Sequence, residues 1–270
     1  MNLVFLANCL SPLIESTLIQ GREELEHKSQ RLEEHIKVPN SEVSLVIGRV
    51  DGLHVAGEIV VRLQAWKSAP SSQTLWIMGN PQPLGKTSAV AAHVVAIAET
   101  ANIPCLSFFC HLANMHNPRK DPEKHRQDQL TTLLYALIRQ LLILTPERFE
   151  DSYNFNSALD CLQGSPEYIP KALDIIRALL VHAPRLLLCV IDGLQLLDHR
   201  DTNSYIDQLL DALRSQNNSR VFKLLLTTIG SFSSGRKLNV IERLDSTALP
   251  RKRPGKALPG GLSLQGLSFS

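Results

Sequence analysis

The feature that most constrains the chain is an apolar run that enters a turn rich in Gly and Pro and closes on Gly-Lys-Thr. The run spans residues 74–79, and the turn ends at Gly85, Lys86 and Thr87. This order is typical of a phosphate-binding loop, in which backbone N–H groups surround phosphate oxygens and the Lys reaches the outer phosphates. The Thr87 hydroxyl is then the expected Mg²⁺ ligand. An Ala-rich apolar run over residues 89–99 predicts a buried helix whose positive N-terminal end lies under the phosphates.

The loop departs from the usual spacing of Gly, four residues and Gly-Lys-Ser/Thr. Five residues separate Gly79 from Gly85, and Asn80 occupies the position expected for the first Gly. Asn tolerates left-handed backbone conformations better than most residues do, whereas Pro81 and Pro83 remove two amide donors. We therefore expect weakened phosphate binding. The alternative interpretation is an ordinary strand-turn-helix connection with an incidental Gly-Lys-Thr.

A second apolar run ends in an acidic residue. The six apolar residues 186–191 directly precede Asp192. Such a run predicts a central parallel strand that is buried on both faces, and we expect it to lie next to the phosphate-loop strand. Open α/β sheets bind ligands at the carboxyl ends of their strands, so Asp192 is the predicted second residue on Mg²⁺. An Asp that caps a helix is the alternative.

Together with several other segments, these motifs resemble a known family. The chain is similar to the NACHT-type NTPase domain of the signal-transducing STAND ATPases, in particular to the nephrocystin-like N-terminal modules abundant in fungal proteins. The resemblance covers about residues 70–245. It rests on Leu75–Thr87 as Walker A, Cys105–Phe109 as the following strand, Leu130–Leu141 as a helix, Val190–Leu194 as Walker B and Lys223–Gly230 as the sensor strand.

The resemblance implies an α/β fold, namely a P-loop NTPase with a mostly parallel sheet flanked by helices and preceded by a short helical N-terminal segment. It also implies a signalling switch that binds ATP with Mg²⁺. The implied metal residues are Thr87 and Asp192, the latter acting through water. The nucleotide-binding residues are then Asn80, Gly85, Lys86, Thr87, Ser88 and, as a sensor of the γ-phosphate, Thr228.

The positions after Walker B depart from the family pattern. The family usually continues Asp-Gly-Leu with Asp-Glu, and here Gln195 and Leu196 stand in those places. A neutral amide cannot accept a proton as a carboxylate does, and Asp198 is expected to point elsewhere. Ile229 stands where the family often has an Arg. We therefore expect weak or absent hydrolysis, and the sequence assigns no catalytic residue.

Composition divides the chain into three parts. Residues 1–68 are expected to form a helical N-terminal segment, residues 69–248 the NACHT-like domain, and residues 249–270 a disordered basic tail. Within the first part, residues 22–36 carry a narrow apolar stripe, which fits either a surface helix or a helix that pairs with a partner. The polar stretch 113–129 is expected to be an exposed loop.

The overall composition excludes several classes of protein. Hydrophobic residues make up 44% of the chain and charged residues 20%, which is typical of a soluble globular protein. The net charge of +2 comes from the tail, so nucleic acid is not an expected partner. No apolar run approaches the roughly 20 residues that span a bilayer, so a membrane is not expected either.

The cysteines indicate the compartment. They number five, an odd count, and are scattered, which favours reduced thiols and a cytoplasmic location. The group Cys105, Cys110, His111 and His116 has a spacing that fits no common zinc site, so we expect packing roles for these residues.

Two functions remain open on the sequence alone. The first is a nucleotide switch of the STAND type with weak hydrolysis. The winged-helix and repeat segments of the family are not recognisable, as expected of a truncated signalling protein or of a domain that acts through protein partners or self-association. The second is a degenerate interaction module that keeps the fold and no longer binds nucleotide. A kinase of small substrates has little support, because no separate substrate-phosphate site is visible.

Overall fold

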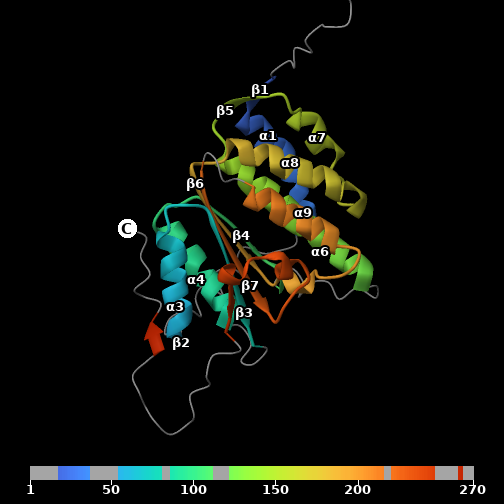
Figure 1. Cartoon of the computed structure of the whole chain (residues 1–270). Coiled ribbons are helices and arrows are strands. Elements are labelled where there is room, and N and C mark those ends of the chain that lie inside the picture. The colour runs from blue at the N-terminus through green and yellow to red at the C-terminus, as the bar shows by residue number, and fades with distance from the viewer. Residues whose placement is uncertain are drawn as a thin grey trace, which may run out of the picture.

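The computed structural model describes residues 18–36, 54–80, 86–111, 122–215, 220–246 and 261–263. Its centre is a five-stranded parallel sheet (Figure 1). Across this sheet the strands follow in the order β4 (Cys105–Phe109), β6 (Leu186–Asp192), β7 (Val221–Ile229), β3 (Gln73–Gly79) and β8 (Arg243–Asp245). Two antiparallel pairs lie outside it, β1 (Leu18–Gly21) with β5 (Arg148–Asp151) and β2 (His54–Ala56) with β9 (Gly261–Ser263).

Helices fill the connections between the strands. The α-helices in the described part of the chain are α1 (Arg22–Ser29), α3 (Gly57–Ser68), α4 (Lys86–Thr100), α6 (Pro122–Leu144), α7 (Phe155–Cys161), α8 (Ile169–His182) and α9 (Asn203–Arg214). Short 3-10 helices occur at η1 (Gln30–His35), η2 (Pro166–Tyr168), η3 (Leu194–Leu196), η4 (Ser234–Lys237) and η5 (Val240–Glu242).

The central strands form where the sequence has continuous apolar runs. Residues 187–192 of β6 and 222–228 of β7 are buried throughout, as in strands that are covered on both faces. Strands alternate with helices along the chain, which places the connecting helices on the faces of the sheet. The expected α/β architecture is thus confirmed, with the helix-flanked parallel sheet of a P-loop NTPase-like fold.

The order of the strands differs from the expectation in one respect. The prediction that the Asp192 strand lies next to the phosphate-loop strand is wrong, because β7 lies between β6 and β3. β7 has nine residues, the most of the five strands, and it pairs with β3 along one edge and with β6 along the other. The register pairs Asp192 with Thr227 and Gly79 with Ile229, so the three strands still end together at one edge of the sheet.

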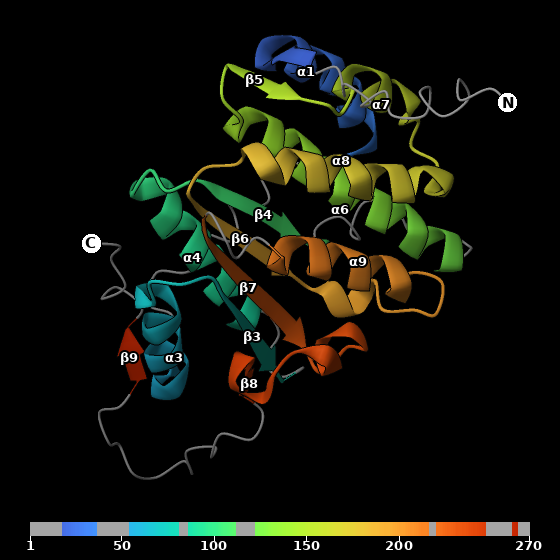
Figure 2. The same cartoon turned by 45° about the horizontal axis from the view of Figure 1, so that its top comes forward.

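Helices cover both faces of the sheet and separate its core into two layers. Figure 2 shows α3 and α4 on one face and α6, α8 and α9 on the other. Leu75 and Ile77 of β3 pack with α3 and α4, whereas Trp76 points to the opposite layer. There the Trp76 ring meets the Phe232 ring edge to face, with the ring centres 5.0 Å apart. Burial of one aliphatic side chain stabilises the folded state by roughly 1.5–3 kcal/mol relative to leaving it exposed. The two layers together therefore hold the sheet, and the edge at which its strands end, in place.

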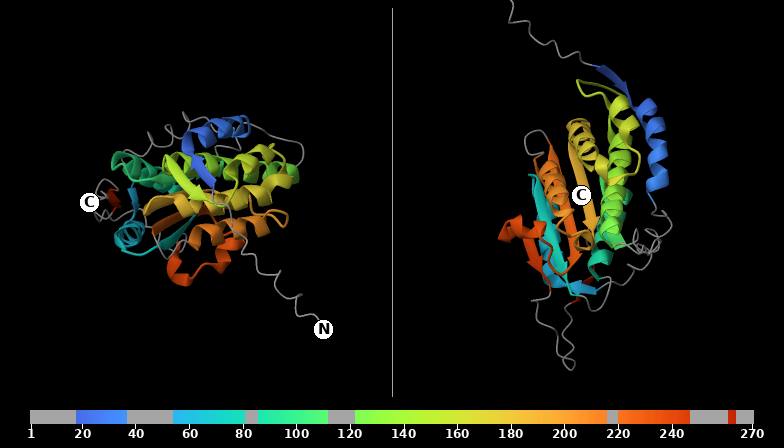
Figure 3. Two further views of the ribbon diagram at one scale, coloured as in Figure 1. Left: turned by 90° about the horizontal axis from the view of Figure 1, so that it is seen from above. Right: turned by 90° about the vertical axis from the view of Figure 1, so that its right-hand side faces the viewer.

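The apolar stripe in residues 22–36 is buried by the chain itself. Leu25 of α1 and Leu32 of η1 are both 0% exposed and belong to the core layer that also contains α6 and α7. The right-hand view of Figure 3 shows α1 along the outer side of α6. The helix therefore docks on this domain, with its charged residues on the solvent side.

Helix α6 begins earlier than the sequence indicates. The prediction of an exposed loop over residues 113–129 is wrong for residues 122–129, which are helical. Pro122 is the first residue of the helix. A backbone N–H at this position makes no hydrogen bond within the helix, so its absence in proline costs nothing there. The polar side chains that follow are compatible with helix because they hydrogen-bond within it, as Thr131 Oγ1 does to the carbonyl of Gln127 at 2.9 Å.

Only a short part of the predicted basic tail lies within the described residues. In residues 249–270, the segment Gly261–Ser263 forms β9 and pairs with β2 ahead of α3. The rest of the predicted tail and residues 1–17 of the N-terminal segment lie outside the described residues. In the part of the chain that the structure describes, no helix combines the length and the apolar character needed to cross a membrane.

Candidate functional site

The carboxyl ends of four central strands come together at one edge of the sheet. There β3 ends at Gly79, β7 at Ile229, β6 at Asp192 and β4 at Phe109, and the register places Phe109 beside Asp192. Helix α4 starts at this same edge with Lys86. In open parallel sheets, ligands bind at the edge where the strands end.

Asp192 is the centre of a buried hydrogen-bond cluster at this edge. The residue is only 2% exposed. Ser88 Oγ donates to Oδ2 at 2.8 Å, and Thr227 Oγ1 donates to Oδ1 at 2.6 Å. Nδ1 of His111 lies 2.9 Å from Oδ2. A buried carboxylate without partners would cost several kcal/mol, and these three donors offset that cost while they fix its orientation.

Gly79 and Thr87 meet closely where the strand passes into the loop. A Cβ placed on Gly79 would lie 2.4 Å from Cγ2 of Thr87, which is closer than real carbon atoms approach. The backbone of Gly79 is also held by Gly230, whose N–H donates to the Gly79 carbonyl at 3.0 Å and whose φ of +75° favours glycine. Only a residue without a side chain therefore lets the first turn of α4 pack against the end of β3.

The first turn of α4 has the electrostatic character of an anion site. Lys86 is exposed and is the first residue of the helix, and no acidic residue lies in the first turn. A positive side chain at a helix N-terminus adds to the positive end of the helix dipole and is unfavourable unless an anion is bound there. Thr87 and Ser88 follow it and are both buried. Asn80 directly follows β3, whereas Gly85 lies outside the described residues.

Thr228 and its neighbour Thr227 face opposite sides of the sheet. Trp76 Nε1 donates to Thr228 Oγ1 at 2.8 Å, and that hydroxyl donates to the Gly230 carbonyl at 2.6 Å. The hydroxyl that meets Asp192 belongs to Thr227. Sequence reasoning chose Thr228 by its resemblance and missed Thr227. The two-residue period of strands could have found it, because Thr227 shares a face with Leu225, which packs in the α4 layer.

The residues after Asp192 turn away from its carboxylate. Gly193 adopts a φ of +84°, and the N–H of this residue donates to the Thr227 carbonyl at 2.8 Å. Leu196 then packs against the core. The Gln195 Oε1 atom is buried without a hydrogen-bond partner among the described residues. Asp198 Oδ2 accepts hydrogen bonds from the backbone N–H and hydroxyl of Ser233 at 2.8 and 3.2 Å, so it is directed at the loop after β7.

In the comparison with family models, residues 61–228 match the nephrocystin 3 N-terminal model. The match covers more than half of the chain. The chain belongs to the nephrocystin 3 N-terminal family. Neither the comparison with curated proteins nor the comparison with solved structures gave a match. The family match begins within α3 and ends within β7, so the residues around Asp192 all lie inside the nephrocystin 3 N-terminal region.

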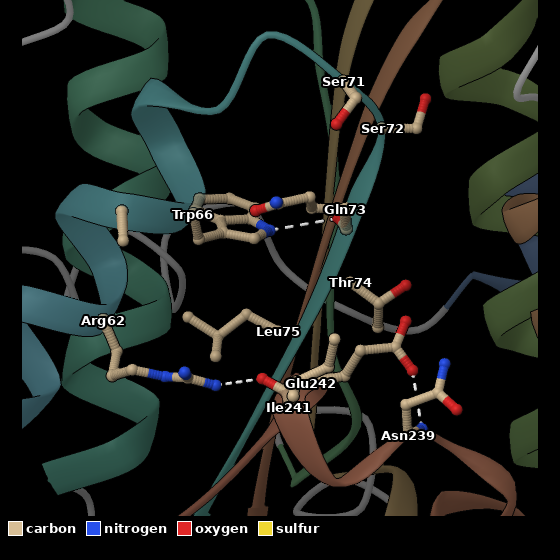
Figure 4. A pocket seen from close by; sticks show the side chains of 11 residues that line it. Arg62, Trp66, Ser71, Ser72, Gln73, Thr74, Leu75, Asn239, Ile241 and Glu242 are labelled. Atoms are coloured by element: carbon tan, nitrogen blue, oxygen red, sulfur yellow. Dashed lines mark hydrogen bonds between the residues drawn. The ribbon is translucent and has the colours of Figure 1, made fainter.

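A groove of about 460 Å³ lies at the other end of β3 (Figure 4). It is lined by α3, by residues 71–75 and by η5. Its polar groups are largely paired with one another: Trp66 Nε1 donates to the Gln73 carbonyl at 3.1 Å, and Arg62 donates to the Ile241 carbonyl. Glu242 lies 3.1 Å from Arg214. Because β3 runs from this groove toward Gly79, the groove is separate from the Asp192 cluster of the nephrocystin 3 N-terminal region.

Two thiols, one at the start of β4 and one just after its end, are held in their protonated form. Burial raises the pKa of Cys105 to about 12, and the negative charge of Glu99 adds to the rise. Burial likewise raises the pKa of Cys110 well above its usual range, with a smaller contribution from Asp192. Protonated thiols are poor metal ligands. Of the group considered for zinc, His111 pairs with Asp192, and His116 lies outside the described residues.

Proposed function

We propose that this nephrocystin 3 N-terminal domain is an ATP-binding switch of the NACHT and STAND type, with weak or absent hydrolysis. The observation that carries the proposal is the hydrogen bond of 2.8 Å between Ser88 and Asp192. It joins the first turn of α4, which contains the Lys and Thr of the Gly-Lys-Thr motif, to the acidic end of β6. A strand-loop-helix unit and a carboxylate from a second strand are the two parts that a site for nucleotide and Mg²⁺ requires.

The side chains at this edge fit a nucleotide bound with Mg²⁺. Hydroxyl and carboxylate oxygens are the protein ligands that Mg²⁺ prefers, and Thr87, Ser88 and Asp192 supply them. Mg²⁺ usually keeps several waters, so we assign Asp192 to the metal through water and Thr87 to direct contact. When bound, the ion neutralises charge on the outer phosphates.

The remaining roles follow from the order of the chain. Lys86 binds the outer phosphates, because its exposed ammonium stands at the positive end of α4. Gly85, Ser88 and Asn80 contribute to the phosphate cradle. Thr227 links Asp192 to β7, and Thr228 positions the loop at Gly230 from which a γ-phosphate is sensed.

Binding without efficient turnover follows from the residues that come after Asp192. The positions that carry acids in the family hold Gln195 and Leu196, and Leu196 packs against the core. Asp198 is engaged by Ser233. A switch of this type changes state when nucleotide binds or leaves, and we propose that protein partners or a second copy of the chain receive that change.

Titration with a fluorescent ATP analogue, with and without Mg²⁺, tests the proposal. We expect saturable binding that is at least about tenfold tighter with Mg²⁺ and is reversed by unlabelled ATP; GTP serves as the test of base preference. The five-residue spacing and the two prolines of the loop favour the second candidate, an interaction module that no longer binds nucleotide. Absence of saturable binding under both conditions would overturn the first function and leave the second candidate.

A further inference from the structure

His111 occupies a place at the proposed nucleotide site that the family resemblance does not assign. It follows β4 by two residues, and β4 is the neighbour of β6 on the side away from β7. Because Phe109 pairs with Asp192, the chain leaves β4 at the edge where Asp192 lies. The His111 side chain is 36% exposed, so the ring reaches solvent at this edge while it contacts a buried carboxylate.

The ring of His111 is contacted by Asp192 and Phe109, and the backbone that carries it is packed as well. Nδ1 lies 2.9 Å from Asp192 Oδ2. The ring of Phe109 meets the imidazole edge to face, with the ring centres 6.3 Å apart. A Cβ on Gly193 would lie 3.6 Å from the His111 backbone nitrogen, so the turn after β6 packs against the turn after β4. An imidazole held in this way presents its second nitrogen in a constant direction.

The pairing with Asp192 determines which ring nitrogen can accept a hydrogen bond. An ionised carboxylate only accepts, so the Nδ1 atom carries the proton and donates it. In the neutral ring, Nε2 then has a free lone pair. Oδ2 of Asp192 also accepts the Ser88 hydroxyl, so Ser88, Asp192 and His111 form one hydrogen-bonded chain from α4 to the end of β4.

The structure offers no carboxylate for an attacking water at the positions where the family carries one. Gln195 and Leu196 replace those acids, and the Asp198 carboxylate accepts from Ser233. We propose that His111 is a water-positioning residue of this site, which accepts a hydrogen bond from the attacking water through Nε2 while Asp192 holds the ring through Nδ1. The inference rests on the proposed function, because it requires a nucleotide at the edge of the sheet.

The role is one of orientation. In hydrolysis the water oxygen bonds to the γ-phosphorus as the bond to the bridging oxygen of ADP breaks, and the water protons pass to phosphate and solvent. The imidazole aligns the water and ends unchanged. Orientation alone, without a strong base, is consistent with the slow turnover proposed above.

Two amide substitutions separate this role from a structural one. His111→Asn retains a donor at the place of Nδ1 and removes the acceptor at Nε2. His111→Gln places its amide where Nε2 of the imidazole lies and gives up the close contact with Asp192. A water-positioning role predicts that Gln is tolerated and Asn is not, whereas a purely structural tie between β4 and Asp192 predicts the reverse. His27→Asn, on the exposed side of α1, is the matched control.

The readout is the affinity for Mg·ADP in the full chain with and without fluoroaluminate, which mimics the transferring phosphoryl group with its water in line. In the parent, fluoroaluminate should tighten binding at least tenfold, since transition-state analogues bind on the order of 10² or more better than substrates. In His111→Asn the increase in affinity caused by fluoroaluminate should be about tenfold smaller than in the parent. In His111→Gln and His27→Asn this increase should stay within about threefold of the parent value. ATP turnover, where measurable, should follow the same order, and Mg·ADP affinity alone should stay within about threefold.

The outcomes distinguish the inference from the function on which it rests. If the parent fails to bind Mg·ADP, the proposed function is wrong and the inference falls with it. If Mg·ADP binds but fluoroaluminate gives no gain, or if His111→Asn keeps the gain while His111→Gln loses it, nucleotide binding stands and the role of His111 is overturned.

Discussion

The Ser88 hydroxyl donates a hydrogen bond of 2.8 Å to Oδ2 of Asp192, although the strands that precede these two residues are separated by β7. The contact spans 104 residues of sequence and crosses the end of the middle strand, where Thr227 donates to the other carboxylate oxygen. Helix α4, the middle strand and the acidic strand are therefore joined through one carboxylate. A change at any of these three positions is expected to alter the whole edge.

Asp192→Asn tests the metal assignment. The amide keeps the shape of the side chain but removes the negative charge, so we expect the Mg²⁺-dependent gain in ATP-analogue affinity to fall at least tenfold. Asp201→Asn, in the loop before α9, is the control and should behave as the parent does. Binding titrations at several Mg²⁺ concentrations measure the effect. An unchanged Mg²⁺ dependence in Asp192→Asn would remove the metal role of this residue.

Gly79→Ala tests the close approach of β3 to α4. The added Cβ would lie 2.4 Å from Thr87 Cγ2, so the first turn of α4 must move. Such overpacking typically costs about 1–3 kcal/mol, and we expect a loss of this size in the free energy of unfolding measured with urea. At Gly21 a Cβ would meet nothing within 4 Å, so Gly21→Ala should change stability by less than about 0.5 kcal/mol. Equal stability of the two variants would contradict the packing described here.

Lys223→Met tests a pH dependence that originates away from the candidate site. Lys223 is buried, its Nζ donates to the carbonyls of Ala69 and Ser71, and burial lowers its pKa from 10.5 to about 8. Between about pH 8 and 10.5 the unfolded chain thus binds more protons at this residue than the folded chain does, so its contribution to stability rises with pH over that window.

Urea unfolding at pH 7.5 and at pH 9.5 measures this effect. The parent should gain stability from Lys223 as the pH rises between these values, and Lys223→Met should lack that gain. Lys237→Met, which changes an exposed lysine on η4, should retain it. A parallel pH dependence in all three proteins would show that the pKa of Lys223 is not lowered by folding.

Gln195→Glu tests why turnover is expected to be slow. The substitution restores an acid at the first of the two family positions, whereas an acid at position 196 would have to replace a leucine that packs against the core. We expect nucleotide affinity within about threefold of the parent and an increase in ATP turnover of about tenfold or more, because general-base catalysis is typically worth on the order of 10² to 10⁴ in rate. Turnover that stays the same would place the defect in the segment between β3 and α4 rather than in the residues after Asp192.

The sequence predicts the elements of this fold well because the strands carry strong local signals. The apolar runs that become β3, β6 and β7 each end at a polar or small residue, and this pattern marks a buried strand and its boundary. The order of these strands depends on contacts between distant segments, which no local pattern contains. The position of β7 between the other two strands could therefore not be predicted from the runs themselves.

Only part of the candidate site could be predicted from the sequence. Lys86, Thr87, Ser88 and Asp192 stand out by motif, and the structure brings the last two into direct contact. The role of Thr227 depends on which face of β7 it occupies, and the resemblance directed attention to its neighbour. His111 carries no motif at all, because its pairing with Asp192 arises from the register of β4 against β6.

The central claim is that ATP binds between the first turn of α4 and the end of β6, and Lys86→Ala tests it most directly. Calorimetric titration of the parent, of Lys86→Ala and of Lys67→Ala with ATP in Mg²⁺ is the measurement; Lys67 lies at the other end of β3, in the last turn of α3. We predict saturable binding by the parent and by Lys67→Ala, and a loss of at least 100-fold in affinity, about 2.7 kcal/mol, for Lys86→Ala with its thermal unfolding unchanged. Equal affinity of Lys86→Ala and the parent would show that this edge of the sheet is not the nucleotide site.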